Sequence, residues 1–333
     1  MSERRFFYLV PPERRDRLMT ESLPRYLRRL LFEPRRRYPT GGIKVIYDHC
    51  RLLREAGYEA WPVHLGHFDV DWFDHGIDPL TDAEALAIMT PDDVLVVPER
   101  IPGAADRFPG RNRVVFAQNQ GLVPAAIAGG RYEDRGFTDV LCCSAYVCEA
   151  IADLTTLPRH TVTNGIDTTR FRPDPSARQD GAVLYLKRKS TWRLGAAALD
   201  RLPGDVAAAI KPVGLPHSCS QAEMIGFYQR ADIFMPLGFP EGFALPPLEA
   251  MACGAVVVGF AGGGGLTHMV DGVSALVVPD GDADALVEAL TRIVRDPALK
   301  ERLRAGGAEM AARFGESRMR EELLSFARLM QAR

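Results

Sequence analysis

Long apolar runs are absent from this sequence. No stretch approaches the roughly 18 consecutive apolar residues that a transmembrane helix needs, so we expect no membrane-spanning helix. The apolar stretch near the N-terminus is too short, and too soon followed by prolines and arginines, to act as a signal peptide. The six cysteines show neither CxxC spacing nor the density of a secreted disulfide-rich domain. These absences favour a cytoplasmic protein with reduced thiols.

The sequence also lacks an excess of charge of either sign. It carries 41 basic and 43 acidic residues, which gives a formal net charge of -2. This balance argues against a role in coating nucleic acid, and we expect no nucleic-acid partner. No P-loop lysine pattern and no histidine pair at metal-ligand spacing occurs. We therefore predict no metal site and no required cofactor.

The sequence does contain a regular alternation of β-rich runs and helical patterns over 333 residues, enough for two domains. This alternation predicts an α/β fold of two Rossmann-like, doubly wound domains that face a central cleft. The expected strands are Phe6–Val10, Ala60–His64, Asp93–Pro98, Arg113–Ala117, Asp139–Ser144, Ala182–Leu186, Val206–Ile210, Asp232–Pro236, Ala255–Phe260 and Ala275–Val278. The expected helices are Ile43–Ala56, Leu194–Leu202, Gln221–Arg230, Pro246–Ala252, Asp284–Val294 and a C-terminal stretch from Pro297 with a break near Gly315.

The segment TNGIDTTRFRPDP, residues 163–175, interrupts the regular pattern with an Asn-Gly pair and two prolines. It predicts a boundary between an N-terminal domain, residues 1–165, and a C-terminal domain, residues 166–315. The last helix, about residues 316–333, is expected to pack back on the first domain. In open α/β sheets ligands bind at the carboxyl ends of the strands, so both domains would offer loops to the cleft.

The most informative stretch is residues 238–271, GFPEGFALPPLEAMACGAVVVGFAGGGGLTHMVD. A loop leads into a helix that opens with two prolines, and the free N–H groups of a helix N-terminus suit a phosphate. Glu241 lies in the loop and Glu249 in the helix, and a carboxylate can accept hydrogen bonds from sugar hydroxyls. Two carboxylates flanking an anion site fit a nucleoside-diphosphate sugar. The helix dipole alone also favours a glutamate in the first turns, which leaves a purely structural role open for Glu249.

The stretch EGFALPPLEAMACGAVVV resembles the family-4 retaining glycosyltransferases of the GT-B fold (glycosyl transferases group 1), whose hallmark is two glutamates separated by seven residues. The resemblance extends through VDGVSALVVPDGDADALVEAL and TNGIDTTRFRP, and is clear over about residues 163–315. It implies that Glu241 binds hydroxyls of the donor sugar and that Glu249 binds the ribose. It also implies that the loop contacts the sugar and phosphates through Gly242, Phe243, Ala244 and Leu245.

The resemblance further implies two basic residues after the first strand of the second domain, which neutralise the diphosphate. Arg188 is the best match, and the second is either Lys189 or Arg193. Preorganised cations would stabilise the charge that builds on a departing diphosphate. The alternative is a solvated charge cluster at a strand end. Ala244 stands where a glycine is commoner in the family, and GGGGLTH replaces its usual proline–glutamate pair, so the donor sugar stays open.

The first domain offers weaker signals. Gly41 and Gly42 precede a helix and would let the backbone approach a phosphate, and the resemblance implies that they close on the donor. Gln118 and Asn119 end a strand, where they either bind hydroxyls on the acceptor side or simply begin a loop. His64, like His67, is a candidate for a histidine near the donor sugar, although a histidine near a strand end is more often structural.

Two further features have competing interpretations. Asp69-Val70-Asp71 is similar to the metal-binding DxD of the other large glycosyltransferase fold, but it lies far from the phosphate motif, and we interpret it as coincidental. Residues 22–33 predict a basic amphipathic helix. This helix either packs on its own domain or makes a peripheral contact with the inner face of a membrane.

Together these features predict a metal-independent, hexosyltransferase-type enzyme that retains the anomeric configuration. It would move a sugar from a UDP, GDP or ADP donor to a glycan, a lipid-linked or a small-molecule acceptor. One alternative is a nucleotide-sugar epimerase or hydrolase on the same fold. Another is a non-catalytic nucleotide-sugar-binding partner in a glycosylation complex.

Overall fold

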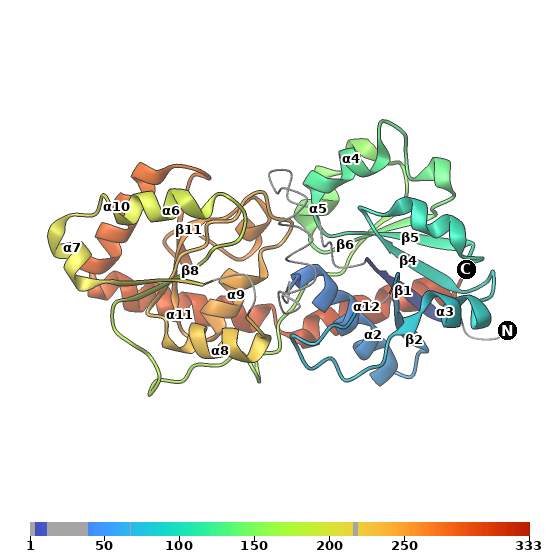
Figure 1. The fold of residues 1–333 in the computed structure, drawn as a ribbon, viewed down its shortest axis with the longest axis horizontal. Coiled ribbons are helices and arrows are strands. Elements are labelled where there is room, and N and C mark those ends of the chain that lie inside the picture. The colour runs from blue at the N-terminus through green and yellow to red at the C-terminus, as the bar shows by residue number, and fades with distance from the viewer. Residues whose placement is uncertain (1–3, 12–38, 67, 216–218) are drawn as a thin grey trace, which may run out of the picture.

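The structure is a computed structural model, and it describes residues 4–11, 39–66, 68–215 and 219–333. These residues form two α/β lobes that lie side by side, each built around one sheet (Figure 1). None of the described helices is long and apolar enough to cross a bilayer. The predicted helix at residues 22–33 and His67 lie outside the described residues.

The first lobe contains a seven-stranded sheet in the order β3-β2-β1-β4-β5-β6-β7, with every pairing parallel. Its strands are β1 (Phe6–Val10), β2 (Ala60–His64), β3 (Leu80–Thr81), β4 (Val94–Pro98), β5 (Asn112–Ala117), β6 (Asp139–Cys142) and β7 (Arg159–Thr161). Its helices are α2 (Gly41–Glu55), α3 (Asp82–Ile88), α4 (Val123–Ile127) and α5 (Ala145–Ala150). The strand order reverses direction between β1 and β4, and such a switch point is where doubly wound sheets form ligand crevices.

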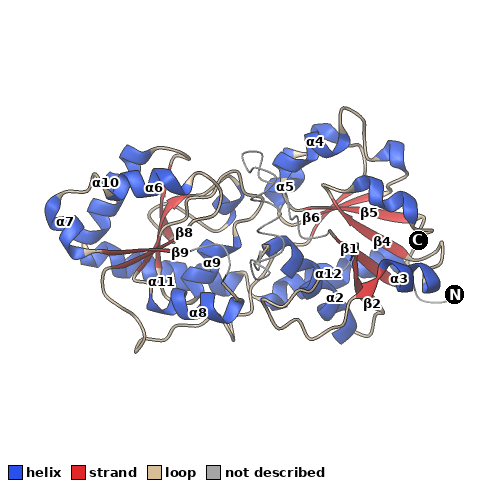
Figure 2. Ribbon diagram, viewed as in Figure 1, coloured by secondary structure: helices blue, strands red, loops and turns tan. Residues whose placement is uncertain are grey.

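The second lobe contains a five-stranded parallel sheet in the order β12-β11-β10-β8-β9. Its strands are β8 (Ala182–Leu186), β9 (Lys211–Leu215), β10 (Ile233–Phe234), β11 (Val256–Phe260) and β12 (Ala275–Val278). Its helices are α6 (Trp192–Leu199), α7 (Gly204–Ala209), α8 (Gln221–Arg230), α9 (Leu245–Ala252), α10 (Ala283–Arg295) and α11 (Pro297–Arg313). Figure 2 shows helices on both sides of each sheet, as parallel sheets require for burial of both faces.

The prediction of a strand at Val206–Ile210 is wrong. Most of this segment belongs to α7, and the strand follows it as β9. Three consecutive alanines favour a helix, and a short apolar run cannot distinguish helix from strand by its periodicity. Pro212 lies within β9, which is an edge strand, where the missing N–H of a proline is tolerated.

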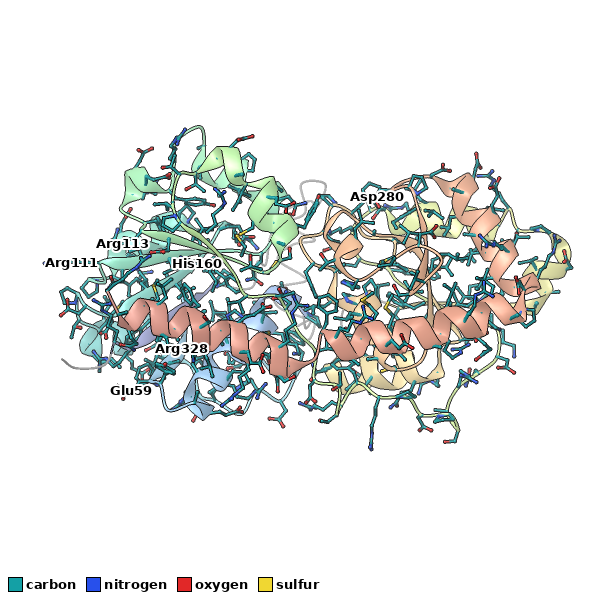
Figure 3. The ribbon with its side chains drawn as sticks, turned by 180° about the vertical axis from the view of Figure 1, so that it is seen from behind. Glu59, Arg111, Arg113, His160, Asp280 and Arg328 are labelled. Atoms are coloured by element: carbon teal, nitrogen blue, oxygen red, sulfur yellow. The ribbon has the colours of Figure 1, made fainter. Side chains whose placement is uncertain are left out.

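The last helix, α12 (Glu316–Gln331), returns to the first lobe and packs against α2. Figure 3 shows α11 and α12 crossing both lobes in succession, with Arg328 on the part that lies against the first lobe. The backbone N–H and C=O of Arg4 bond the Gln331 side chain at 2.8 and 2.7 Å, and Arg333 bonds Asp139 at 2.8 Å. These bonds hold both the N-terminal and the C-terminal end of the described chain on the first lobe.

Candidate active site

A cavity of about 470 Å³ lies between the two lobes. The first lobe lines it with the start of α2 and with the ends of β4 and β5, and the second lobe lines it with the end of β8, with α8 and with the loop before α9. The predicted site residues that line it are Gly41, Gly42, Gln118, Asn119, Arg188, Glu241, Gly242, Phe243, Ala244, Leu245 and Glu249. Segments far apart in the sequence thus meet at the carboxyl edges of the two sheets.

The loop before α9 turns sharply into the helix at Ala244. This residue has φ 63° and ψ 73°, a left-handed conformation in which an L side chain is strained and glycine is usually favoured. Pro246 and Pro247 then occupy the first turn of α9, where no amide hydrogen is needed. The turn presents the N-terminus of α9 to the cavity and accounts for the glycine that is commoner at position 244.

The carboxylate of Glu241 faces two cations. It forms ion pairs with Arg188 and with Lys189, whose Nζ lies 2.8 Å from Oε1. Its backbone is fixed as well, because Glu241 donates to Gly262 O at 2.7 Å and accepts from Gly264 N at 3.0 Å. The run of four glycines is therefore a backbone partner of the Glu241 loop.

Asp280 holds this glycine run in place through a hydrogen bond. Its Oδ1 accepts a hydrogen bond of 2.9 Å from the N–H of Gly262, and Asp280 is labelled on the second lobe in Figure 3. A Cβ at Gly264 would lie only 2.2 Å from the Gly242 carbonyl, so no larger residue fits there without movement. The close backbone contact explains the glycine at position 264.

The carboxylate of Glu249 belongs to α9, the helix that follows the Glu241 loop. It accepts a hydrogen bond of 3.1 Å from the hydroxyl of Tyr228 on α8. Burial raises the pKa of Glu249, and the positive charge of Lys44 on α2 of the other lobe opposes that rise. Tyr228 and Glu249 thus form a polar floor for the cavity.

Lys44 brings a buried positive charge to the cavity from the first lobe. Its Nζ lies 2.6 Å from Oδ2 of Asp48, one helical turn further along α2. Burial alone would lower the pKa of Lys44, but the charges of Asp48, Glu249 and Glu316 outweigh it and the pKa is raised. Glu249 and Lys44 therefore stabilise each other's charged forms across the two lobes.

The two candidates for the second cation are separated by the structure. Lys189 pairs with Glu241, and burial lowers its pKa despite that carboxylate. Arg193 is exposed and holds its guanidinium over the ring of Trp192 at 5.4 Å, and neither Arg193 nor Lys189 is among the residues that line the cavity. The assignment of Arg188 and Lys189 to a diphosphate remains a prediction, and Arg193 is poorly placed for that role.

On the first lobe, Gly41 lies against the second lobe and Gly42 lies against Gln118 of its own lobe. A Cβ at Gly41 would lie 3.3 Å from Leu245 Cδ1, and a Cβ at Gly42 would lie 2.9 Å from Gln118 Oε1. His64 does not line the described part of the cavity. Its ring nitrogens contact the Tyr47 hydroxyl at 2.5 Å and the Phe68 carbonyl at 3.1 Å, which is the structural role that the sequence left open.

Sequence reasoning missed Lys44, Tyr228, Trp72 and Glu99, all of which line the cavity. Glu99 directly follows β4 and is buried, and this burial raises its pKa to about 7. The rule that ligands bind at the carboxyl ends of strands could have singled out Glu99, as it did Gln118. Lys44 and Tyr228 carry no such signal, because each lies within a regular helix.

Asp69 and Asp71 are not among the residues that line the cavity. Within the described ranges, no group of three or more His, Cys, Asp or Glu side chains is arranged to hold a metal ion. The absence of a metal requirement remains a prediction to be tested by experiment.

We expect Gly242→Ala to lower the free energy of unfolding by about 1–3 kcal/mol, the usual cost of overpacking. A Cβ there would lie 2.0 Å from the Gln118 carbonyl oxygen of the other lobe, and Ser144 already donates to the Gly242 carbonyl at 2.8 Å. Urea unfolding measures the effect. Gly204→Ala is the control, because a Cβ there meets no atom within 4 Å. Equal stability of both variants would show that the two lobes do not touch at Gly242.

Part of the second lobe matches known proteins in sequence. Residues 209–310 match the family described as glycosyl transferases group 1. The D-inositol 3-phosphate glycosyltransferase of Kribbella flavida is 35% identical over 111 residues, which are 33% of this chain and 25% of the relative. That of Frankia alni is 40% identical over 97 residues, 29% of this chain and 24% of the relative. The matched segment spans about a quarter of the length of these relatives.

Solved structures are similar over nearly the whole chain. Sucrose-phosphate synthase from Thermosynechococcus elongatus has a TM-score of 0.70 at 16% identity, with 99% of this chain and 100% of that chain covered. Anabaena HepE in complex with UDP-glucose has a TM-score of 0.71 at 14% identity, with 97% and 98% covered. At such low identity these matches establish the fold, which is GT-B as the sequence predicts. The chain is thus a GT-B protein, and residues 209–310 of its second lobe match the glycosyl transferases group 1 family.

Proposed function

We propose that the protein is a retaining glycosyltransferase that moves a sugar from a nucleoside-diphosphate sugar to an acceptor. The observation that carries this proposal is the placement of Glu241 and Glu249 in one cavity, on either side of the N-terminus of α9. Arg188 and Lys189 lie beside Glu241, so cations and backbone N–H groups converge where a diphosphate would bind. The family of the second lobe supports the same activity.

The ribose, the diphosphate and the sugar of the donor are each assigned to side chains at this site. Glu249, braced by the Tyr228 hydroxyl, is placed to accept hydrogen bonds from the two ribose hydroxyls. Arg188 and Lys189 would neutralise the diphosphate, and Glu241 would then be free to bind hydroxyls of the sugar. The diphosphate would therefore replace Glu241 as the ion-pair partner of the two cations. This replacement lowers the cost of desolvating the cations.

The reaction follows from these positions. The bond between the anomeric carbon and the diphosphate oxygen breaks, and its electron pair stays on the diphosphate. Arg188, Lys189 and the α9 N-terminus stabilise that growing negative charge in a site shielded between two lobes. The acceptor oxygen forms the new bond on the same face of the sugar, and its proton passes to the departing diphosphate oxygen. The protein contributes chiefly positioning and charge stabilisation.

The acceptor would enter from the first lobe, past Gln118 and Asn119. Both line the cavity opposite the donor loop, and Asn119 also accepts a 2.9 Å hydrogen bond from Gly121 N, which fixes its side chain. The acceptor class remains a glycan, a lipid-linked or a small molecule. Solved HepE was captured with UDP-glucose, which supports a nucleotide sugar as donor here.

A panel of nucleotide sugars with and without candidate acceptors tests this function. A transferase should hydrolyse its donor slowly alone and transfer the sugar when an acceptor is present. Proton NMR of the product then reports the anomeric configuration, and an inverted product would contradict the retaining mechanism. Release of an epimerised donor would favour the epimerase alternative, and tight binding without turnover would favour the non-catalytic partner.

We expect turnover to continue in excess chelator. Arginine, lysine and helix N–H groups can supply the charge compensation that a divalent cation provides in other transferases. The measurement is the initial rate after exhaustive EDTA treatment, compared with the rate after magnesium or manganese is restored. Loss of activity in chelator, with recovery on addition of metal, would contradict this expectation and return attention to Asp69 and Asp71.

For location we propose the cytoplasm, since the six cysteines form no disulfide within the described residues. A peripheral contact with the inner face of a membrane through residues 22–33 is part of the same proposal. Fractionation of cells with and without a deletion of residues 22–33 tests both statements.

A further inference from the structure

Two of the six cysteines lie together in the first lobe. Cys142 ends β6, and Cys148 lies in α5, the short helix that follows this strand. Thr161 on β7 is the register partner of Cys142, and its hydroxyl donates a hydrogen bond of 3.4 Å to the sulfur of Cys148. The thiol of Cys142 also donates a hydrogen bond to Cys148. The two sulfurs are therefore in direct contact.

The thiol of Cys148 favours its ionised form. The hydrogen bond from Cys142 lowers the pKa of Cys148 to about 6, and the Thr161 hydroxyl and the charge of Arg159 act in the same direction. Burial opposes this shift. The same hydrogen bond, together with burial, raises the pKa of Cys142. The thiolate is the reactive form of cysteine, so Cys148 is the nucleophile of the pair.

Cys148 is also the member of the pair that lies near solvent. The residue is partly exposed and the neighbouring Glu149 is exposed, whereas Cys142 is fully buried. A small oxidant therefore approaches Cys148 first. A low-pKa cysteine near solvent, with a second thiol in contact, is the usual arrangement of a redox-sensitive pair.

The helix that carries Cys148 also touches the second lobe. Ser144, the N-cap of α5, donates a hydrogen bond of 2.8 Å to the Gly242 carbonyl. Tyr146 lies against the glycine run, because a Cβ at Gly263 would lie only 2.2 Å from the Tyr146 hydroxyl. Gly242 and the glycine run in turn hold the backbone of the Glu241 loop. A movement of α5 would therefore reach that loop.

We propose that Cys142 and Cys148 are a redox modification site, which hydrogen peroxide converts to a reversible disulfide. The Cys148 thiolate attacks one peroxide oxygen, the O–O bond breaks, and a sulfenic acid forms as hydroxide leaves. The Cys142 sulfur then attacks the sulfenic sulfur and displaces its oxygen as a second hydroxide. The protons of the two thiols convert both hydroxides to water. The sulfur pair thus loses two electrons, and one peroxide is reduced to two waters.

The disulfide is expected to weaken the contact between α5 and the Glu241 loop. Its sulfurs lie about 2.05 Å apart, well inside hydrogen-bonding distance, so α5 must move relative to the end of β6. The helix spans only Ala145–Ala150, and the movement therefore extends to Ser144. Loss of its bond to Gly242 should weaken the binding of nucleoside diphosphate about 3- to 10-fold, the worth of one hydrogen bond. Only this effect on binding rests on the proposed function.

Mass spectrometry of the peroxide-treated protein tests the disulfide. Trypsin releases residues 136–159 as one peptide, which contains Cys142, Cys143 and Cys148. In the wild type this peptide should lose two hydrogens and regain them in dithiothreitol. Cys148→Ser should prevent the loss, and Cys142→Ser should leave a sulfenic acid at Cys148.

Cys143→Ser is the matched control. The Cys143 thiol donates to the Gln118 carbonyl at 3.4 Å instead of joining the pair, so this variant should still lose two hydrogens. An unchanged peptide mass in the peroxide-treated wild type would overturn the proposal. A loss of two hydrogens that persists in Cys148→Ser would overturn it as well.

Calorimetry with UDP, GDP and ADP tests the effect on binding. The oxidised wild type should bind the preferred nucleotide more weakly than the reduced wild type, and the variant C142S/C148S should bind it alike before and after peroxide. Equal affinity of the two wild-type forms, with the disulfide present, would overturn the link between α5 and the Glu241 loop. If no nucleoside diphosphate binds the reduced protein, the proposed function fails, whereas the peptide masses still decide whether the disulfide forms.

Discussion

Glu241→Gln is expected to lower kcat by about 10- to 100-fold while free nucleoside diphosphate still binds. The glutamine keeps the shape of the side chain but removes its charge and replaces one acceptor by a donor. Glu241 is assigned to the transferring sugar, which gains positive charge as its bond to phosphate breaks, so a nearby carboxylate helps most at that moment. The structure adds that this change removes the ion-pair partner of Arg188 and Lys189, and both cations remain available to the diphosphate.

We expect Glu249→Gln to impair donor binding more than turnover. The ribose is bound alike in the ground state and the transition state, so loss of its carboxylate should mainly raise KM for the donor. It should also weaken free nucleoside diphosphate by about 10- to 100-fold, with a smaller effect on kcat. Lys44 would lose a partner at the same time, but its 2.6 Å bond to Asp48 remains.

Calorimetry of nucleoside diphosphate with both variants, alongside steady-state kinetics, separates the two roles. If Glu241→Gln loses nucleotide binding while Glu249→Gln keeps it, the roles are reversed. If both variants retain full activity, the cavity beneath α9 is not the active site.

Arg188→Ala is expected to weaken the binding of nucleoside diphosphate by about 10- to 100-fold and to lower turnover. Arg188 lines the cavity beside Glu241, and a charge-assisted contact to phosphate is worth about 1.5–3 kcal/mol. Turnover falls further than ground-state binding requires, because the charge on the diphosphate grows as the sugar departs. Lys189, which also lies beside Glu241, remains available to the diphosphate, so the variant should keep some activity.

Arg193→Ala is the matched control for this experiment. It removes the same charge from the same segment, but Arg193 is exposed and rests over Trp192 outside the cavity. Thermal unfolding should show that both variants are folded. Unchanged affinity of Arg188→Ala for every nucleoside diphosphate would reject its assignment, and an equal loss in both variants would point to a long-range field rather than a direct contact.

The sequence by itself determined those features that depend on residues near one another in the chain. Apolar strands alternate with amphipathic helices, and nine of ten expected strands occur close to their predicted positions. The double proline that opens α9 and the spacing of its two glutamates are also local, because a loop and one helix hold both of them. The strand expected at Val206–Ile210 is mostly helix, and the prediction was wrong because a short apolar run does not distinguish a helix from a strand.

The tertiary structure alone decided which distant residues meet. Lys189 and Arg193 are equivalent in sequence, but the backbone places only Lys189 beside Glu241. Lys44 acts on Glu249, and Trp72 bonds Gln221, although each pair joins two lobes and is separated by more than a hundred residues in the chain. Such contacts depend on how the two sheets dock, and that docking is determined by burial over many residues rather than by the pattern of any one segment.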